Sequence, residues 1–405
     1  MELKAYGFFF TEADYCRLVG DAEGFRKYVD DVYALHPEIF PRGFPQGYVF
    51  HDHRKSKKIK GLVIRRIMLA NGEAYSIIPS DTMPYLVGKT MGVDKGLVLR
   101  RYGVPYEVIA YVLGRDAMYW ERIEDSLGRI SIVGSACKRA LPQHLAADEK
   151  VSFWNNQEMY VAMTASGDCL LGAEISMSED AVGLTEAYGV FLTEARDIDS
   201  AYQPSSVNLD GWKATVKAWV SLLPGIAVIL CFLHSYLKIR NISKNLKEEF
   251  QEIATKFWAC YAQKTAAEFA QALKGLKDWA NENLTKYQHI VLKINEIAEK
   301  SGKFELAYQY PDCYRTSNQI DRPMNDLDRY LYSMKYFHGH RTTANQKIRG
   351  WTILYNFVPF SKKTRQKKRA SRFEERNQFA YHQHWLQNLL VAGSCNAKNL
   401  NHKIR

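Results

Sequence analysis

The sequence lacks the cysteine patterns that hold small folds together. Its seven cysteines are scattered singly, and no two of them form a C-x-x-C motif. This distribution predicts neither a disulfide framework nor a zinc ribbon, and it fits a reducing cytoplasm. A chain of 405 residues, 46% of them hydrophobic, is nevertheless long enough for two or three domains with cores of their own.

The sequence also lacks a long uninterrupted apolar run. The longest run is broken by Pro224-Gly225 and is too short to cross a bilayer. Residues 1–10 contain no basic segment followed by a long apolar one, so we expect no signal peptide. These absences predict a cytoplasmic protein without a membrane partner.

Acidic residues are in short supply relative to basic ones. The 55 Lys and Arg residues outnumber the 44 Asp and Glu residues and give a formal net charge of +11. This excess favours a polyanionic partner, with nucleic acid as the first candidate and a membrane surface as the weaker one.

Two basic runs, at 51–60 and 362–372, concentrate this charge. We predict that both runs contact DNA phosphates, with a solvated surface as the alternative for the first. The predicted contacts are Arg54, Lys55, Lys57, Lys58, Lys362, Lys363, Arg365, Lys367, Lys368 and Arg369.

Residues 1–90 are expected to form a small α+β unit. Residues 12–35 predict one helix, which ends at His36-Pro37. Residues 62–78 alternate between apolar and polar around Asn71-Gly72, and this pattern predicts a β-hairpin.

Residues 91–140 predict a helix-turn-helix. Helices are expected over 94–101, 106–113 and 116–127, with a tight turn at Gly114. The last helix would lie in the major groove of DNA. The alternative is an ordinary helical hairpin packed into a core. The expected N-caps are Asp94 and Asp116, and the candidate DNA contacts are Arg115, Tyr119, Arg122 and Trp120.

Two short apolar segments end in an aspartate. Residues 144–148 and 206–210 each predict a buried strand with an acid, Asp148 or Asp210, at its tip. Open α/β sheets bind their ligands at the carboxyl ends of strands. The two acids are therefore candidates for a common site.

The neighbouring segments complete an α/β pattern. Residues 158–165 and 169–176 predict a hairpin. Residues 212–222 predict a helix, and the aliphatic run 226–233 predicts a strand buried on both faces of a sheet.

This order of strand, hairpin, helix and strand resembles an RNase H-like domain. The motifs HLAADEK (144–150), VNLDGWKAT (207–215), CFLH (231–234) and TSNQID (316–321) resemble those of DDE transposases of bacterial insertion sequences. More narrowly, the chain resembles members that share two features with Mutator-like and hAT-like enzymes: a C-x-x-H after the second Asp and an all-helical insertion before the third acid. The resemblance covers roughly two thirds of the chain.

The resemblance implies an α/β fold with an RNase H-like mixed sheet, formed by residues 141–236 and 307–360. Residues 237–306 are then the all-α insertion, and their apolar residues at helical spacing favour an amphipathic bundle. Residues 361–405 are expected to form a basic loop and a C-terminal helix over 379–390.

The resemblance also implies an activity. A DNA transposase binds the terminal inverted repeats of an insertion sequence and catalyses Mg²⁺-dependent DNA cleavage and strand transfer. Two Mg²⁺ ions, for which Mn²⁺ can substitute, stabilise the attacking and leaving oxygens. The implied partners are double-stranded DNA and further copies of this chain, in a homodimer or higher oligomer on the nucleoid of a prokaryote.

Asp148, Asp210 and Asp321 are the implied catalytic and metal-binding acids, because Mg²⁺ prefers carboxylate oxygens. Asp328 would share a helical face with Asp321 and is the alternative third acid. Pro323 predicts a helix that begins near Asp321, since proline is tolerated in a first helical turn.

The C-x-x-H residues Cys231 and His234 are implied to support the active site. Two ligands are too few for a structural zinc site, and the residues alone leave core packing open for Cys231.

Two other functions remain open. A catalytically inactive DNA-binding protein derived from a transposase would keep the helix-turn-helix and lose metal chemistry, although Asp148 and Asp210 argue against it. A nuclease of the same fold would cut DNA without joining strands, and the sequence does not separate cutting from joining.

Overall fold

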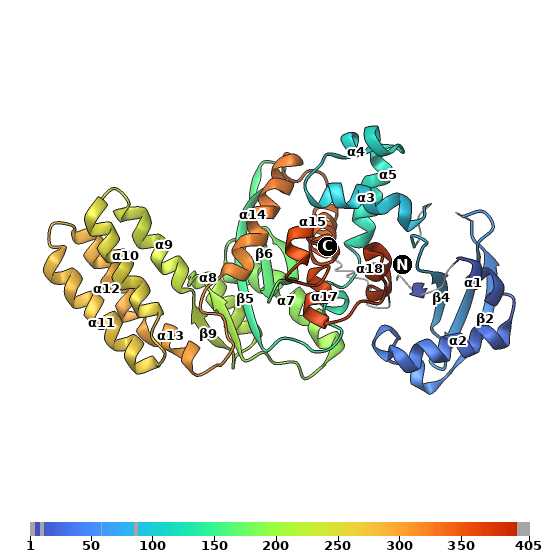
Figure 1. The fold of residues 1–405 in the computed structure, drawn as a ribbon, viewed down its shortest axis with the longest axis horizontal. Coiled ribbons are helices and arrows are strands. Elements are labelled where there is room, and N and C mark those ends of the chain that lie inside the picture. Colours follow the sequence, from blue (N-terminus) through green and yellow to red (C-terminus); the bar gives the residue numbers. More distant parts are fainter. Residues whose placement is uncertain (1–4, 9–11, 58, 85–87, 395–405) are drawn as a thin grey trace.

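The computed structural model describes residues 5–8, 12–57, 59–84 and 88–394. The molecule is elongated, with an N-terminal unit at one end, a helical bundle at the other and a helix-covered sheet between them (Figure 1). The fold is mixed α/β with two sheets, as the sequence predicts at that level. Among the described residues, no helix has the length and apolarity needed to span a membrane.

The N-terminal unit is a four-stranded sheet with two α-helices. Its elements are β1 (Ala5–Phe8), α1 (Glu12–Leu18), α2 (Ala22–Leu35), two short 3₁₀ helices (Pro37–Ile39 and Phe44–Gln46), β2 (Tyr48–Lys55), β3 (Val63–Leu69) and β4 (Ala74–Pro79). The strand order is β1-β4-β3-β2, and the hairpin predicted at Asn71-Gly72 is confirmed. The single helix predicted over 12–35 is wrong, because Gly20-Asp21 interrupts it and the Asp21 carboxylate caps α2 through the backbone N–H of Gly24.

Four helices follow in the next part of the chain. They are α3 (Thr90–Arg101), α4 (Tyr106–Leu113), α5 (Ala117–Leu127) and α6 (Ile132–Ala136). The three predicted helices are present, and Asp116 caps α5 as expected, accepting from the backbone N–H of Tyr119 at 2.7 Å. Asp94 is not a cap, because α3 already begins at Thr90.

Trp120, a candidate DNA contact, instead belongs to the core. Its side chain is buried, and its indole N–H donates to the carbonyl of Gly114 at 3.0 Å. The ring occupies the space over Gly96 of α3, where no Cβ would fit. The prediction failed because α5 packs against α3 on this side.

A five-stranded sheet forms the centre of the molecule. Its strands are β5 (His144–Trp154), β6 (Gln157–Ser166), β7 (Cys169–Ser176), β8 (Ser206–Leu209) and β9 (Ala227–Leu230). The order is β7-β6-β5-β8-β9. β5, β6 and β7 form an antiparallel meander that includes the predicted hairpin, whereas β8 and β9 run parallel to β5.

Helices cover both faces of this sheet. One face packs against α7 (Ala181–Ile198) and α8 (Lys213–Leu222), with Trp219 in the core between them. The other face packs against α14 (Asn318–Ser333) and α15 (Arg341–Phe357), where Trp351 is fully buried. α5 packs on α15, so the N-terminal helices join the central unit.

Two strand boundaries differ from prediction. β5 continues beyond Asp148 because it stays paired with β6 as far as Trp154, so Asp148 lies inside the strand rather than at its tip. β9 stops at Leu230 because the chain turns into α9 (Phe232–Ser243), for which Cys231 is the N-cap.

The helices predicted over 237–306 are present, although the first of them, α9, begins five residues before that range. The helices after α9 are α10 (Lys247–Tyr261), α11 (Ala266–Asn283), α12 (Gln288–Glu299) and α13 (Ser301–Glu305), followed by a 3₁₀ turn (Leu306–Tyr308). They share a core that includes Phe257, Phe269 and Ile294.

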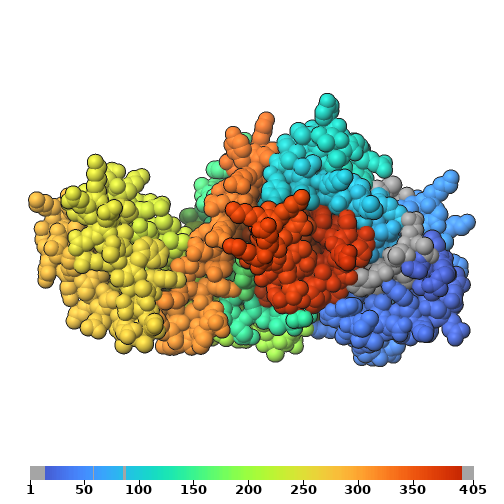
Figure 2. Space-filling model, in the orientation of Figure 1, coloured from blue at the N-terminus to red at the C-terminus, as the bar shows by residue number. Residues whose placement is uncertain are grey.

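The C-terminal segment returns to the central unit. Its helices are α16 (Lys362–Arg365), α17 (Arg372–Asn377) and α18 (Trp385–Ala392). Figure 2 shows this segment, in red, on the near face beside α14. α18 begins later than predicted because Tyr381 is bent back, its backbone N–H donating to Asn388 Oδ1 at 2.9 Å.

Candidate active site

Two neighbouring parallel strands bring Asp148 and Asp210 together. β5 and β8 pair in register, with Ala146 opposite Asn208. Each aspartate follows its paired residue by two positions, so both acids lie at the same level of the sheet. Asp210 Oδ1 also accepts a hydrogen bond from the backbone N–H of Trp212 at 2.7 Å, which turns the chain towards α8.

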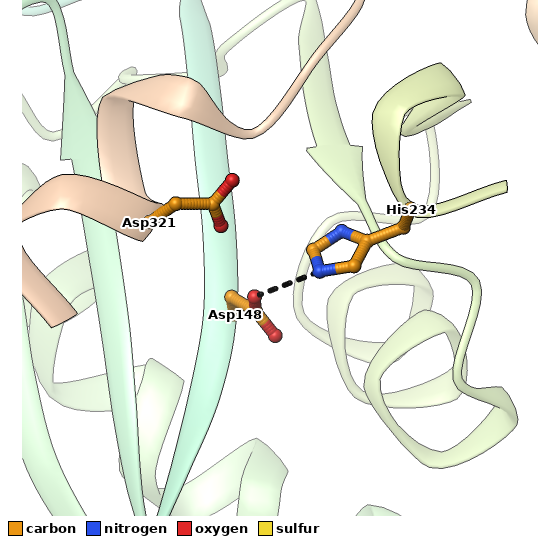
Figure 3. A group of neighbouring side chains, drawn as sticks. All are labelled: Asp148, His234 and Asp321. Atoms are coloured by element: carbon orange, nitrogen blue, oxygen red, sulfur yellow. Dashed lines mark ion pairs between the residues drawn. The ribbon is translucent and has the colours of Figure 1, made fainter. Parts of the chain in front are cut away.

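The candidate third acid, Asp321, lies on α14, which packs on the face of the sheet that Asp148 shares. Asp321, in the first turn of α14, points towards Asp148, and His234 approaches from α9 (Figure 3). Asp148, His234 and Asp321 each offer one ligand atom, and these atoms lie within 4.8 Å of one another. The His234 Nε2 to Asp148 Oδ2 distance is 4.0 Å. Three segments that are far apart in the sequence therefore converge.

The C-x-x-H motif is tied to the third acid through Ser317. Cys231 Sγ accepts hydrogen bonds from the backbone N–H of His234 at 3.4 Å and of Ser317 at 3.2 Å. Ser317 Oγ donates to Asp321 Oδ2 at 2.9 Å and lies 3.3 Å from His234 Nδ1. Cys231 and Ser317 are both buried. Cys231 thus caps α9 and also anchors the start of α14.

Burial raises the pKa values of Asp148 and Asp321. Burial, with the neighbouring charges of Asp210 and Asp321, raises the pKa of Asp148 to about 7. Burial also raises the pKa of Asp321. The hydrogen bond to Cys231 is the largest cause of a raised pKa for His234. The site therefore favours a bound proton or a cation.

Asp328 lies outside this group. Its carboxylate forms an ion pair with Lys150 Nζ at 2.9 Å and is about half exposed. Lys150 follows Asp148 by two residues on β5, so this pair fixes α14 over the strand. The geometry separates the two candidates for the third acid and brings only Asp321 to Asp148.

The helix start predicted from Pro323 is wrong by three residues. α14 begins at Asn318, so Pro323 lies in its second turn. The helical hydrogen bonds begin at Ser317, whose carbonyl accepts from the backbone N–H of Asp321 at 3.0 Å. Asp321 keeps its place in the first turn.

The donor set fits a hard divalent cation. Asp148 and Asp321 offer carboxylate oxygens, the ligands that suit Mg²⁺ and Mn²⁺. Asp210 follows the neighbouring strand β8 at the level of Asp148, although its carboxylate is not one of these three ligand groups. His234 adds an imidazole nitrogen, which suits transition metals. A cation would relieve the repulsion between these partly buried carboxylates.

The remaining candidates lie on α5 and in the turn before it, which contains Arg115. Arg115 and Arg122 are exposed and Tyr119 is half-buried. The Arg115 guanidinium lies 5.4 Å from the centre of the Tyr119 ring. These three side chains are accessible to a partner.

The two basic runs lie in different parts of the molecule. Arg54 and Lys55 end β2 and Lys57 follows it, all exposed, whereas Lys58 lies outside the described residues. The second run forms α16 and the loop after it. Its exposed cations are Lys362, Lys363, Arg365, Lys367, Lys368 and Arg369.

The sequence interpretation gave no role to Ser317, which belongs to the site, or to Glu149, which lies next to Asp148 in the chain. Ser317 lies inside the TSNQID motif but received no role, because only the fold reveals its contact with Cys231. Glu149 is half-buried on the other face of β5, where it accepts hydrogen bonds from Tyr188 and Thr215, both at 2.7 Å. Alternation along the strand separates Glu149 from Asp148.

Known proteins add no identification. A scan against family models and a search of curated proteins found no match to this chain. The resemblance to DDE transposases consequently stays a prediction, and any function has to be argued from the residues and their arrangement.

Proposed function

We propose that this chain is a DNA transposase of the DDE type, with Asp148, Asp210 and Asp321 as its catalytic acids. The observation that carries the proposal is that Asp148 on β5 and Asp321 in the first turn of α14 offer ligand atoms within 4.8 Å of each other, with Asp210 at the end of the neighbouring strand β8. Such a group of partly buried carboxylates suits metal-assisted phosphodiester chemistry.

The topology supports the same proposal. An antiparallel meander followed by two parallel strands, with the first two acids on neighbouring strands, is the arrangement expected of an RNase H-like domain. The helical bundle enters between β9 and α14, where the transposase resemblance expects an insertion before the third acid.

Each residue of the site would have its own role in the proposed reaction. Asp148, Asp210 and Asp321 would hold the divalent ions, which when bound activate the attacking oxygen and stabilise the leaving one. Ser317 orients the Asp321 carboxylate through its hydroxyl. His234, beside Asp148, can stabilise negative charge near the reacting phosphate when it is protonated.

The basic surfaces would supply DNA binding. Exposed cations of both basic runs can contact phosphates without regard to sequence. The proposed contacts to the element ends are Arg115 in the turn before α5 and Tyr119 and Arg122 on α5, as in a helix-turn-helix. Assembly as a homodimer or higher oligomer on DNA belongs to the same proposal.

The test is DNA cleavage and joining by the full-length chain. The substrate is the gene with its native flanking DNA, incubated with a target plasmid and Mg²⁺ or Mn²⁺. Wild type should cut between the element ends and the flanking DNA and join the element ends to the plasmid. Asp148→Asn and Asp210→Asn should do neither while still binding DNA. Cutting without joining would indicate a nuclease, and tight binding without cutting would indicate a DNA-binding derivative. Either result would overturn the proposal.

A further inference from the structure

A groove opens where β5 begins. Its volume is about 620 Å³, and its walls come from the start of β5, the turn between β6 and β7, the loop before α14, and α17. Four of its lining residues are cationic, namely Arg139, Lys368, Arg372 and Arg376. The acids in the lining are Asp168, Asp312 and Glu375.

The charge around this groove favours a polyanion. Asp168 is paired with Lys368, and Glu375 accepts a hydrogen bond from the backbone N–H of Arg369 at 3.0 Å. Residues 358–373 contain no acid, and the loop that they form carries six exposed cations beside the groove. A concave surface under such a field concentrates anionic ligands.

The groove and the acidic group share a strand. His144 lines the groove, and Asp148 lies four residues further along β5 on the same face, roughly 13 Å away. Tyr314 also lines the groove, and its carbonyl accepts from Asn208 Nδ2 at 3.0 Å. Three residues later, Ser317 contacts the third acid. One strand and one loop thus connect the two places.

We propose that this groove binds the sugar–phosphate backbone of DNA about four nucleotides from the reacting phosphate, with Arg139 and Lys368 contacting phosphate oxygens. The distance of four nucleotides follows from the separation along β5, because a B-form strand advances about 3.4 Å per nucleotide. The distance of four nucleotides from the reacting phosphate rests on the proposed function. The contact between the groove's cations and DNA phosphates does not. The groove would set the direction in which the strand leaves the active site.

Arg139 and Lys368 are the residues to change, because both are exposed. Arg372 and Arg376 also donate to backbone carbonyls, of Tyr355 at 3.0 Å and of Ser166 at 3.3 Å, so that their removal would disturb the fold.

The experiment measures binding of the full-length chain to a short mixed-sequence DNA duplex by fluorescence anisotropy over a range of KCl concentrations. Arg139→Gln with Lys368→Gln should weaken binding at least about tenfold and make the salt dependence shallower by about 2 in log K against log [salt]. The matched control is Arg196→Gln with Lys217→Gln, two exposed cations on α7 and α8 across the sheet. The control should match wild type in both measurements.

Neutralising one acid of the groove should change DNA affinity in the opposite direction. Asp168→Asn removes a negative charge from the groove and frees Lys368, so it should tighten binding severalfold. Glu186→Gln, an exposed acid on α7, should leave binding unchanged. The groove is ruled out if the double variant resembles its control or if Asp168→Asn has no effect.

Cleavage of the same protein separates this inference from the proposed function. If wild type cleaves DNA and the double variant binds DNA as tightly as wild type does, the groove proposal alone is wrong. Groove-dependent binding with no cleavage in Mg²⁺ or Mn²⁺ would overturn the transposase proposal and leave the groove as a DNA site.

Discussion

Arg101, at the end of α3, forms an ion pair with Asp326 of α14, with an Nη2 to Oδ2 distance of 2.7 Å. Beside it, the Tyr330 hydroxyl donates to Glu124 of α5 at 2.9 Å, and Glu124 also pairs with Arg100 at 2.7 Å. These contacts join α3, and α5 with its proposed DNA contacts, to α14, the helix that carries Asp321. Arg100, Glu124 and Tyr330 are buried, and a satisfied polar network of this kind makes the contact between the helices rigid.

Loss of the Glu124 charge should destabilise the protein strongly. Glu124→Gln leaves the buried Arg100 guanidinium without its anion, which costs about 3–5 kcal/mol. Urea unfolding measures the change. The control Glu252→Gln breaks an exposed pair with Lys256 and should cost less than about 1 kcal/mol. Equal losses in the two variants would contradict the network.

The Ser317 hydroxyl should matter more for cleavage than for stability. Ser317→Ala removes the hydrogen bond to Asp321 and should lower the cleavage rate about 10- to 100-fold, through misplacement of the carboxylate. The cost in unfolding free energy should be about 1 kcal/mol. Ser243→Ala, at a buried serine that donates to Ile239, is the matched control with a similar stability cost. If both variants cleave equally well, Ser317 does not position the acid.

Stability of the metal-free protein should depend on the protonation of Asp148. Its pKa is raised from 3.8 to about 7, so the folded state holds a proton that the unfolded state has released between these values. The resulting stabilisation is complete below about pH 4 and is lost as the pH rises through 7. Chemical denaturation in EDTA should therefore show Asp148→Asn gaining stability relative to wild type between pH 4 and 7. A difference that does not change with pH would refute this assignment.

Divalent cations should stabilise wild type but not the same variant. Mg²⁺ or Mn²⁺ binding to the folded state alone raises the melting temperature by mass action. Asp148→Asn should melt higher than wild type without metal at pH 8, because it relieves repulsion, and should respond little to added metal. Asp328→Asn should respond like wild type, since Asp328 pairs with Lys150. Identical responses in all three proteins would place the cation elsewhere.

Local signals predicted most of the elements that build the site. Apolar runs ending in aspartate identified the strands that carry Asp148 and Asp210, and Asp116 marked the start of α5. These features depend on neighbouring residues, so a single sequence contains them. The same holds for the hairpin at Asn71-Gly72.

Features set by tertiary contacts were not predictable. The local sequence around Trp120 predicts an exposed residue of a recognition helix. In the structure its ring instead packs against Gly96 of α3. The link from Cys231 to Ser317 joins residues that are far apart in the chain, and no local spacing encodes it. The choice between Asp321 and Asp328 likewise depends on how α14 lies over β5.

The central claim is that Asp321 rather than Asp328 completes the acidic group. The measurement is the single-turnover rate of DNA cleavage in Mg²⁺, with excess protein bound to the gene and its native flanking DNA. It compares Asp321→Asn with Asp328→Asn, two variants of the same helix. The account predicts a loss of about a thousandfold for Asp321→Asn and a change of less than about tenfold for Asp328→Asn. A severe loss in Asp328→Asn with activity kept in Asp321→Asn would contradict it.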